Sequence, residues 1–232
     1  MKPGDPQAVR VMFEEIASSY DTLNDLLSLR LHRVWKRQAL SWIKPQPGQC
    51  LLDLCCGTGD VSFLLAEQVR PSGTVLGVDT AILPLQTAEL RATSQPWLCV
   101  RWQQADAIMT GLTKSSIDGV IMAYGLRNIL DPIGGLWEIH RVLKPNGRAT
   151  ILDFNPQPTG LGAYFQQFYL RQLVVPIADY FGLKQHYNYV ESSLDRFPTG
   201  QEQEELAYKV GFRIARYIPL AGGQMGLLRL KA

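Results

Sequence analysis

The chain has 232 residues, of which 46% are hydrophobic and 19% are charged, with a formal net charge of +2. This length and composition favour a single α/β domain with a complete hydrophobic core, and the nearly balanced charge argues against a nucleic-acid-binding surface. No apolar run reaches the roughly 18 residues of a membrane-spanning helix, and the N-terminus lacks a stretch of signal-peptide type. The four cysteines have no zinc-type spacing, so we expect reduced thiols in the cytosol and no metal.

Residues 6–43 have three apolar stripes with helical spacing, and they predict an N-terminal helical lid. Tyr20 and Asp21 lie at the break between the first two stripes. The densest basic group lies in the last part of this segment. It indicates either a solvated helix face or contact with an anionic membrane surface. Its members are Arg30, Arg33, Lys36 and Arg37.

The segment 51–60 predicts a short buried strand, a glycine turn and the start of a helix. Leucines form the strand, and Gly57 and Gly59 let a ligand approach the backbone closely. Such a unit binds nucleotide-like ligands in open α/β sheets. A dinucleotide site would need a third glycine where Ser62 stands. Asp79 follows Gly59 by 20 residues, the offset expected for an acid on a ribose. An adenosine ligand without a diphosphate therefore fits better than NAD.

Strand and helix patterns alternate through the core, residues 48–154. They predict strands at 50–54, 74–79, 99–103, 117–122 and 148–154, and helices at 60–70, 83–94 and 131–143. This alternation indicates a parallel sheet with right-handed crossovers. Because ligands bind at the carboxyl ends of such strands, we expect Asp79, Asp106 and the segment 123–125 to meet the glycine loop in one crevice.

The C-terminal section, 199–232, predicts a helix followed by two strands. Thr199 and Glu202 form a capping box for a helix that ends near residue 210. The strands at 212–220 and 225–230 are joined by only four residues, so they must be antiparallel. A parallel sheet that ends in an antiparallel hairpin is typical of class I S-adenosylmethionine-dependent methyltransferases. We therefore expect a single, doubly wound, seven-stranded Rossmann-like sheet.

The insertion at 155–198 is rich in aromatic and aliphatic residues. It predicts a helical hairpin packed on the sheet, or an apolar lid or tunnel for a lipophilic substrate near a membrane. The two interpretations are compatible, because one face of a helix can pack on the sheet while the other contacts the substrate.

Three stretches resemble the quinone-biosynthesis C-methyltransferases and a fourth is similar to the general methyltransferase pattern, and the resemblance runs from about residue 10 to the C-terminus. They are the N-terminal pattern from Phe13 to Lys36, Leu52-Asp53-x-x-x-Gly57-Thr58-Gly59-Asp60, Tyr124-Gly125-Leu126-Arg127-Asn128, and Leu143-Lys144-Pro145-x-Gly147. Arg30 stands where the family usually has glycine, and Ala123 where some members have serine.

Cys55-Cys56-Gly57 and Gly222-Gly223-x-Met225-Gly226 resemble the phylloquinone branch of this family. The resemblance implies C-methylation of 2-phytyl-1,4-naphthoquinol with S-adenosylmethionine, the last methylation step of phylloquinone (vitamin K1) biosynthesis. Demethylmenaquinol or a polyprenyl benzoquinol are alternative substrates. A small-molecule N- or O-methyltransferase, an NAD-binding reductase and a non-enzymatic binding subunit are further alternatives. Packing explains Cys55 and Cys56 better than catalysis does.

The resemblance also implies residue roles. The loop amides would donate to the cofactor's carboxylate, Asp79 would accept the ribose hydroxyls, and Asp106 would accept the adenine amine unless it only caps a turn. The implied cofactor-binding residues are Asp53, Gly57, Thr58, Gly59, Asp79, Asp106, Ala107 and Ala123. The quinone must be reduced, because only the electron-rich quinol ring is nucleophilic. Arg127 would stabilise the quinol oxygen, with Asn128 and Tyr20 positioning it; the alternative for Arg127 is a structural salt bridge.

The expected partners are a lipophilic quinol, a second copy of the chain in a homodimer, and the thylakoid or inner membrane surface. We expect a cytoplasmic protein in peripheral contact with that membrane.

Overall fold

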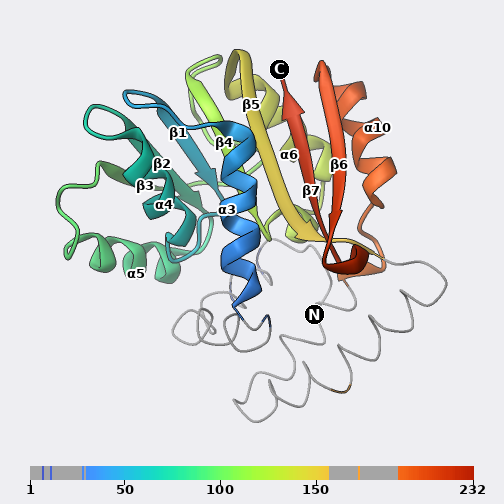
Figure 1. The fold of residues 1–232 in the computed structure, drawn as a ribbon, viewed down its shortest axis with the longest axis horizontal. Helices are drawn as coiled ribbons and strands as arrows, with labels where there is room; N and C mark the ends of the chain where they lie inside the picture. The colour runs from blue at the N-terminus through green and yellow to red at the C-terminus, as the bar shows by residue number, and fades with distance from the viewer. Residues whose placement is uncertain (1–6, 8–10, 12–27, 29, 157–171, 173–192) are drawn as a thin grey trace.

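A computed structural model describes residues 7, 11, 28, 30–156, 172 and 193–232. These residues contain one seven-stranded sheet with the order β3-β2-β1-β4-β5-β7-β6 (Figure 1). The strands are β1 (Cys50–Leu54), β2 (Thr74–Asp79), β3 (Val100–Gln104), β4 (Ile117–Ala123), β5 (Leu143–Phe154), β6 (Ile214–Leu220) and β7 (Met225–Lys231). The first five strands pair in parallel, whereas β7 is antiparallel to both β5 and β6. The predicted sheet is confirmed.

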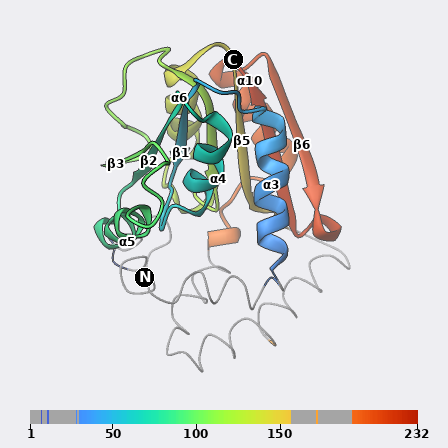
Figure 2. The same cartoon turned by 60° about the vertical axis from the view of Figure 1, so that its left-hand side comes forward.

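Helices cover both faces of this sheet (Figures 1 and 2). The helices are α3 (Leu31–Ile43), α4 (Asp60–Val69), α5 (Ile82–Ala92), α6 (Pro132–Val142) and α10 (Gly200–Val210), with 3₁₀ turns η1 (Leu126–Asn128) and η3 (Ala221–Gly223). Apolar residues of α3 and α4 form one core cluster, and those of α6 and α10 form a second. Along β1, Leu51 packs in the first cluster and Leu52 and Leu54 in the second, because successive side chains of a strand point to opposite faces.

The element bounds differ from prediction mainly in β5. This strand begins at Leu143, not at residue 148, because Leu143 pairs with Ile117 before the register shifts at Gly119. The capping box at Thr199 is present as predicted, and Gly211 ends α10 in the left-handed region.

Two predicted segments lie mostly outside the described residues. Of the N-terminal lid the structure describes chiefly α3, which is helical as expected; of the insertion it describes only its two ends and residue 172. Arg30 precedes α3 with φ 63°, so the left-handed turn is made although glycine is replaced. Within the described part of the chain, no helix has both the length and the apolarity to cross a membrane. The division into subsegments stays a prediction.

Candidate functional site

A cavity lies at the carboxyl ends of β1, β2 and β4, where the sequence predicts a ligand crevice. Its described lining comes from the β1–α4 loop, the segments that follow β2, β3 and β4, and from α3. The predicted site residues on this lining are Asp53, Gly57, Thr58, Asp79, Asp106, Ala107, Ala123 and Asn128. The fold therefore brings together side chains that are up to 75 residues apart in the sequence, from Asp53 to Asn128.

Asp53 is a buried acid on the face of β1 that α4 covers. Its Oδ2 accepts a hydrogen bond from Ser62 Oγ at 2.6 Å. Burial raises the pKa of Asp53 to about 7, although the Ser62 hydrogen bond and the charge of Lys36 oppose this shift. Ser62, which replaces the third glycine of a dinucleotide motif, thus has a function of its own: it holds this carboxyl group.

Asp79 ends β2 and binds the glycine loop. Its Oδ2 accepts from the Gly57 amide at 2.8 Å, and its Oδ1 accepts from the Ala81 amide at 2.9 Å. Burial raises the pKa of Asp79, against the opposing effect of these amides. Each carboxylate oxygen keeps a second lone pair, so the acid remains able to accept hydroxyl groups from a ligand.

Gly59 is not among the described residues that line the cavity, and its predicted part in cofactor binding stays a prediction. Its φ is 87°, and a Cβ at this position would lie 2.5 Å from the ring of Trp102 on β3. Its amide donates to the Cys56 carbonyl at 3.0 Å. Glycine is therefore required here for a left-handed turn against an indole ring, a contact that the sequence motif does not reveal.

Asp106 and Ala107 lie in the loop that follows β3. Asp106 is exposed, and its Oδ1 accepts from the Ile108 amide at 3.0 Å. This is the turn-capping contact considered as an alternative for Asp106. The second carboxylate oxygen of Asp106 and the buried Ala107 remain available to the cavity.

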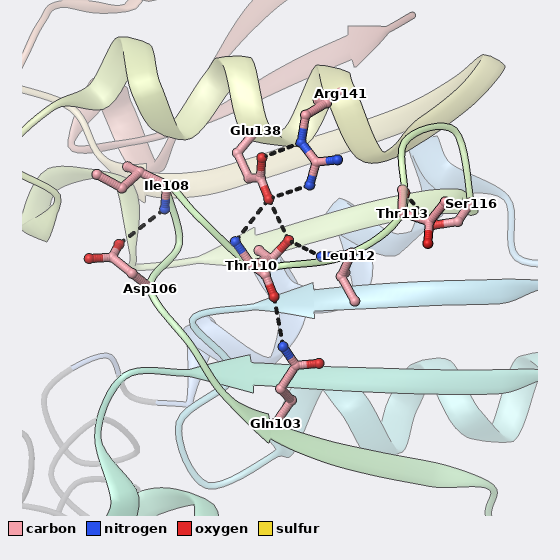
Figure 3. A network of polar contacts seen from close by, with 9 residues as sticks. All are labelled: Gln103, Asp106, Ile108, Thr110, Leu112, Thr113, Ser116, Glu138 and Arg141. Carbon is pink, nitrogen blue, oxygen red and sulfur yellow. Dashed lines mark hydrogen bonds and ion pairs between the residues drawn. The ribbon is translucent and has the colours of Figure 1, made fainter.

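A polar network fixes the rest of this loop (Figure 3). Glu138 on α6 is buried, and its carboxylate accepts from the Thr110 amide at 2.9 Å and from the Thr110 hydroxyl. It also accepts from Arg141 Nε and Nη2 at 2.7 and 2.8 Å. Gln103 Nε2 donates to the Thr110 carbonyl at 2.7 Å. Burial by itself would raise the pKa of Glu138, but the hydrogen bonds from Arg141 and Thr110 outweigh this effect, and the pKa lies below its ordinary value.

Cys55 and Cys56 belong to the lining of the cavity. Burial raises the pKa of both thiols well above its ordinary value, and neighbouring aspartates raise it further. Thiols in this environment stay protonated and are poor nucleophiles, which agrees with a packing role. A Cβ at Gly125 would lie 2.7 Å from Cys55 Cβ, so the glycine gives the Cys55 side chain its space.

Arg127 and Asn128 occupy η1, after β4. The Arg127 guanidinium lies 3.5 Å (Nε) from Asp153 Oδ1 and 5.2 Å above the Phe154 ring. Its Nη1 donates to Asn128 Oδ1 at 3.0 Å. Arg127 is buried but does not line the cavity, whereas Asn128 does. These contacts correspond to the structural alternative for Arg127, and a part in the reaction stays a prediction. Tyr20 lies outside the described residues.

Lys36 on α3 is a site residue that the sequence pattern did not single out. It is only 6% exposed and lines the cavity, so the interpretation of its basic group as a solvated face is wrong for this member. Its Nζ lies 3.2 Å from Asp60 Oδ2, and Arg91 Nη2 lies 2.7 Å from Asp60 Oδ1. Burial by itself would raise the pKa of Asp60, but the two cations Lys36 and Arg91 outweigh this effect, and the pKa lies below its ordinary value. The helical spacing of the sequence could have indicated this, because Lys36 lies on the same buried side of α3 as His32, Leu40 and Ile43.

Comparisons with known proteins agree with this geometry. The model of the ubiE/COQ5 methyltransferase family matches residues 1–229. A 2-phytyl-1,4-naphtoquinone methyltransferase from Nostoc sp. strain PCC 7120 is 47% identical over 221 residues, covering 95% of this chain and 96% of that protein. The chloroplastic 2-phytyl-1,4-beta-naphthoquinone methyltransferase of Arabidopsis thaliana is 40% identical over 222 residues, covering 94% of this chain and 85% of that protein.

Among solved structures, a SAM dependent methyltransferase from Aquifex aeolicus is similar in fold, with a TM-score of 0.62 and 16% identity, covering 84% of this chain and 88% of that one. The sheet order, the cavity at the strand ends and the near full-length sequence match lead to one conclusion: the chain belongs to the ubiE/COQ5 methyltransferase family.

Proposed function

We propose that this protein transfers the methyl group of S-adenosylmethionine to a ring carbon of 2-phytyl-1,4-naphthoquinol, which gives phylloquinol. The observation that carries the proposal is the 47% identity, over 95% of the chain, to a protein named for the methylation of 2-phytyl-1,4-naphtoquinone. Demethylmenaquinol and polyprenyl benzoquinols are the alternative substrates. The proposed reaction is the last methylation step of phylloquinone biosynthesis.

The charges of the cavity suit this methyl donor, which carries a sulfonium, an ammonium and a carboxylate. Five aspartates are among the described residues that line the cavity: Asp53, Asp60, Asp79, Asp106 and Asp131. Such a lining attracts a ligand with two positive groups and an adenosine. In this proposal Asp53 binds the ammonium, Asp79 binds the ribose hydroxyls, and Asp106 and Ala107 bind adenine. Ala123 offers only its backbone and a small side chain. The proposal needs no metal, and the absence of one stays a prediction.

When bound, the methyl donor supplies an electrophilic carbon on sulfur. The chain must then orient the quinol ring and stabilise negative charge on its oxygen, since a phenolate raises the electron density of the neighbouring ring carbon. In this proposal Asn128 binds that oxygen from the cavity wall. Its Nδ2 donates one hydrogen to the Tyr124 carbonyl at 3.0 Å. Arg127 holds Asn128 in this orientation through Nη1 and adds positive potential, although Asp153 compensates part of its charge. Tyr20 is the further residue proposed to position the oxygen.

We further propose that the phytyl tail leaves the cavity over an apolar rim toward a membrane. Ile108 and Leu130 line the cavity and are 40% and 60% exposed. Ile133 and Trp137 on α6 are 48% and 54% exposed. The apolar insertion 155–198 is proposed to cover the tail. The protein would then work from the cytoplasmic side, in peripheral contact with the thylakoid or inner membrane, as a monomer or homodimer.

The test is a methylation assay with radiolabelled S-adenosylmethionine and three quinones: 2-phytyl-1,4-naphthoquinone, demethylmenaquinone and a polyprenyl benzoquinone. Each is assayed with and without dithionite. We expect kcat/KM to be highest for the reduced phytyl naphthoquinone. A preference for another ring would replace the proposed substrate, and equal methylation without dithionite would refute the requirement for the quinol.

A further inference from the structure

The proposed methyl donor has a carboxylate that needs a positively charged or hydrogen-bonding partner inside an acidic cavity. Among the described residues that line the cavity there are five aspartates, and Lys36 is the single Lys, Arg or His. A carboxylate placed near these acids without a cation would be repelled, because like charges in a partly desolvated site destabilise each other.

The glycine-loop amides, which the sequence suggests as partners for this carboxylate, are largely engaged within the protein. The Gly57 amide donates to Asp79 Oδ2 at 2.8 Å, and the Gly59 amide donates to the Cys56 carbonyl at 3.0 Å. The Cys56 amide donates to the Val78 carbonyl at 3.0 Å. A backbone amide has one proton, so these three amides are not available to a ligand.

The position of Lys36 suits this role. Lys36 reaches the cavity from α3, near the two acids that border the glycine loop. Its Nζ lies 3.2 Å from Asp60 Oδ2, and its charge is close enough to lower the pKa of Asp53 against the effect of burial. Its side chain is only 8% exposed, so little water screens it. An ammonium group has three protons, and one bond to Asp60 leaves the others for a second acceptor.

We infer that Lys36 binds the carboxylate of S-adenosylmethionine. Asp60 holds the ammonium group of Lys36 in place, and Arg91 in turn holds Asp60. Asp53 then faces the amino group of the same ligand, so the two charged groups of the amino acid moiety meet opposite charges from α3 and β1. This inference rests on the proposed function, because it assigns a contact to the proposed methyl donor.

The experiment compares two ligands that differ only in the carboxylate. S-adenosylhomocysteine and its decarboxylated analogue, S-adenosyl-3-thiopropylamine, are titrated by calorimetry into the wild-type protein and Lys36→Met. We expect Lys36→Met to weaken S-adenosylhomocysteine about 10- to 100-fold, the range for a lost charge-assisted hydrogen bond. The decarboxylated analogue should change less than about twofold, because it lacks the group that Lys36 contacts.

Two further variants separate direct contact from indirect effects. Arg37→Met removes the same charge one residue further along α3, where the side chain is exposed, and should leave both affinities within about twofold. Arg91→Met removes the other cation on Asp60, which holds Lys36 in place, so it should weaken S-adenosylhomocysteine more than the decarboxylated analogue, but by a smaller factor than Lys36→Met does. If Lys36→Met does not fold, Lys36→Gln carries the same comparison.

The outcomes are distinct. A loss by Lys36→Met that is equal for both ligands, or no loss for either, overturns the contact while the methyl-donor site stands. A wild-type protein that binds neither ligand refutes the proposed function itself. A loss confined to S-adenosylhomocysteine supports the inference.

Discussion

The network around Glu138 gives the prediction that the structure defines most fully. Glu138→Ala removes a buried carboxylate that accepts two hydrogen bonds from Thr110 and two from Arg141. Arg141 is partly exposed and can turn to water, but Thr110 is 1% exposed and its amide loses its acceptor. An orphaned buried donor and a lost charge-assisted bond cost about 1–3 kcal/mol each, so we expect a loss of about 3 kcal/mol in the free energy of unfolding.

The same substitution should weaken ligand binding, because Thr110 anchors the loop that carries Asp106 and Ala107 (Figure 3). We expect the Kd of S-adenosylhomocysteine to rise about tenfold, the cost of ordering a few loop residues on binding. Replacing the ligand's adenine by hypoxanthine tests this further, since an unanchored Asp106 should discriminate the two bases less well. Glu138→Gln, which keeps one acceptor, should show about half of each effect.

The measurements are urea unfolding and calorimetric titration, at pH 7 and near pH 4. The pKa of Glu138 is lowered in the folded protein from its ordinary value of 4.5, so its stabilising contribution is complete above that value and falls as the pH drops through the folded pKa. The difference between wild type and Glu138→Ala should therefore shrink in acid. A loss below about 1 kcal/mol at pH 7, together with an unchanged Kd, would refute the proposed anchoring.

Three other predictions follow from the site. The pKa of Asp53 is raised to about 7, and only the ionised carboxylate attracts an ammonium group, so S-adenosylhomocysteine should bind about tenfold tighter at pH 8 than at pH 6. Asp53→Asn should remove this pH dependence. If calorimetry shows the same change of Kd with pH in the variant as in the wild type, Asp53 is not its source. Gly59→Ala should destabilise the protein by about 2–4 kcal/mol in urea unfolding, because of the positive φ and Trp102, and a stable variant would show that the indole moves freely. Arg127→Met should lower the free energy of unfolding by about 3–5 kcal/mol, because it leaves the buried charge of Asp153 uncompensated. The double variant Arg127→Met/Asp153→Leu should recover part of this loss. If Arg127→Lys and Arg127→Ala both keep near wild-type turnover, Arg127 has no part in the reaction.

Local pattern was sufficient for much of this fold. The leucines of β1, the glycine turn and the acid at the start of α4 define a strand–loop–helix unit within ten residues. The capping box of α10 and the four-residue connection before β7 likewise depend only on neighbours in the sequence, which is why the antiparallel end of the sheet was predictable. The carboxyl-end rule then placed Asp79, Asp106 and Ala123 in one cavity.

Only the tertiary structure decided which of these residues line the cavity and which make contacts within the fold. Gly59 contacts Trp102 and Arg127 contacts Asp153. Lys36 lies in a basic segment of α3, but its side chain lines the cavity. Each of these contacts joins segments 24 or more residues apart, such as Lys36 and Asp60. The identity of one residue does not determine its distant partner, because burial and charge compensation depend on how the elements pack. The sequence by itself determined the sheet and the kind of ligand, and the packing of α3, β3 and β5 determined how charge is distributed around it.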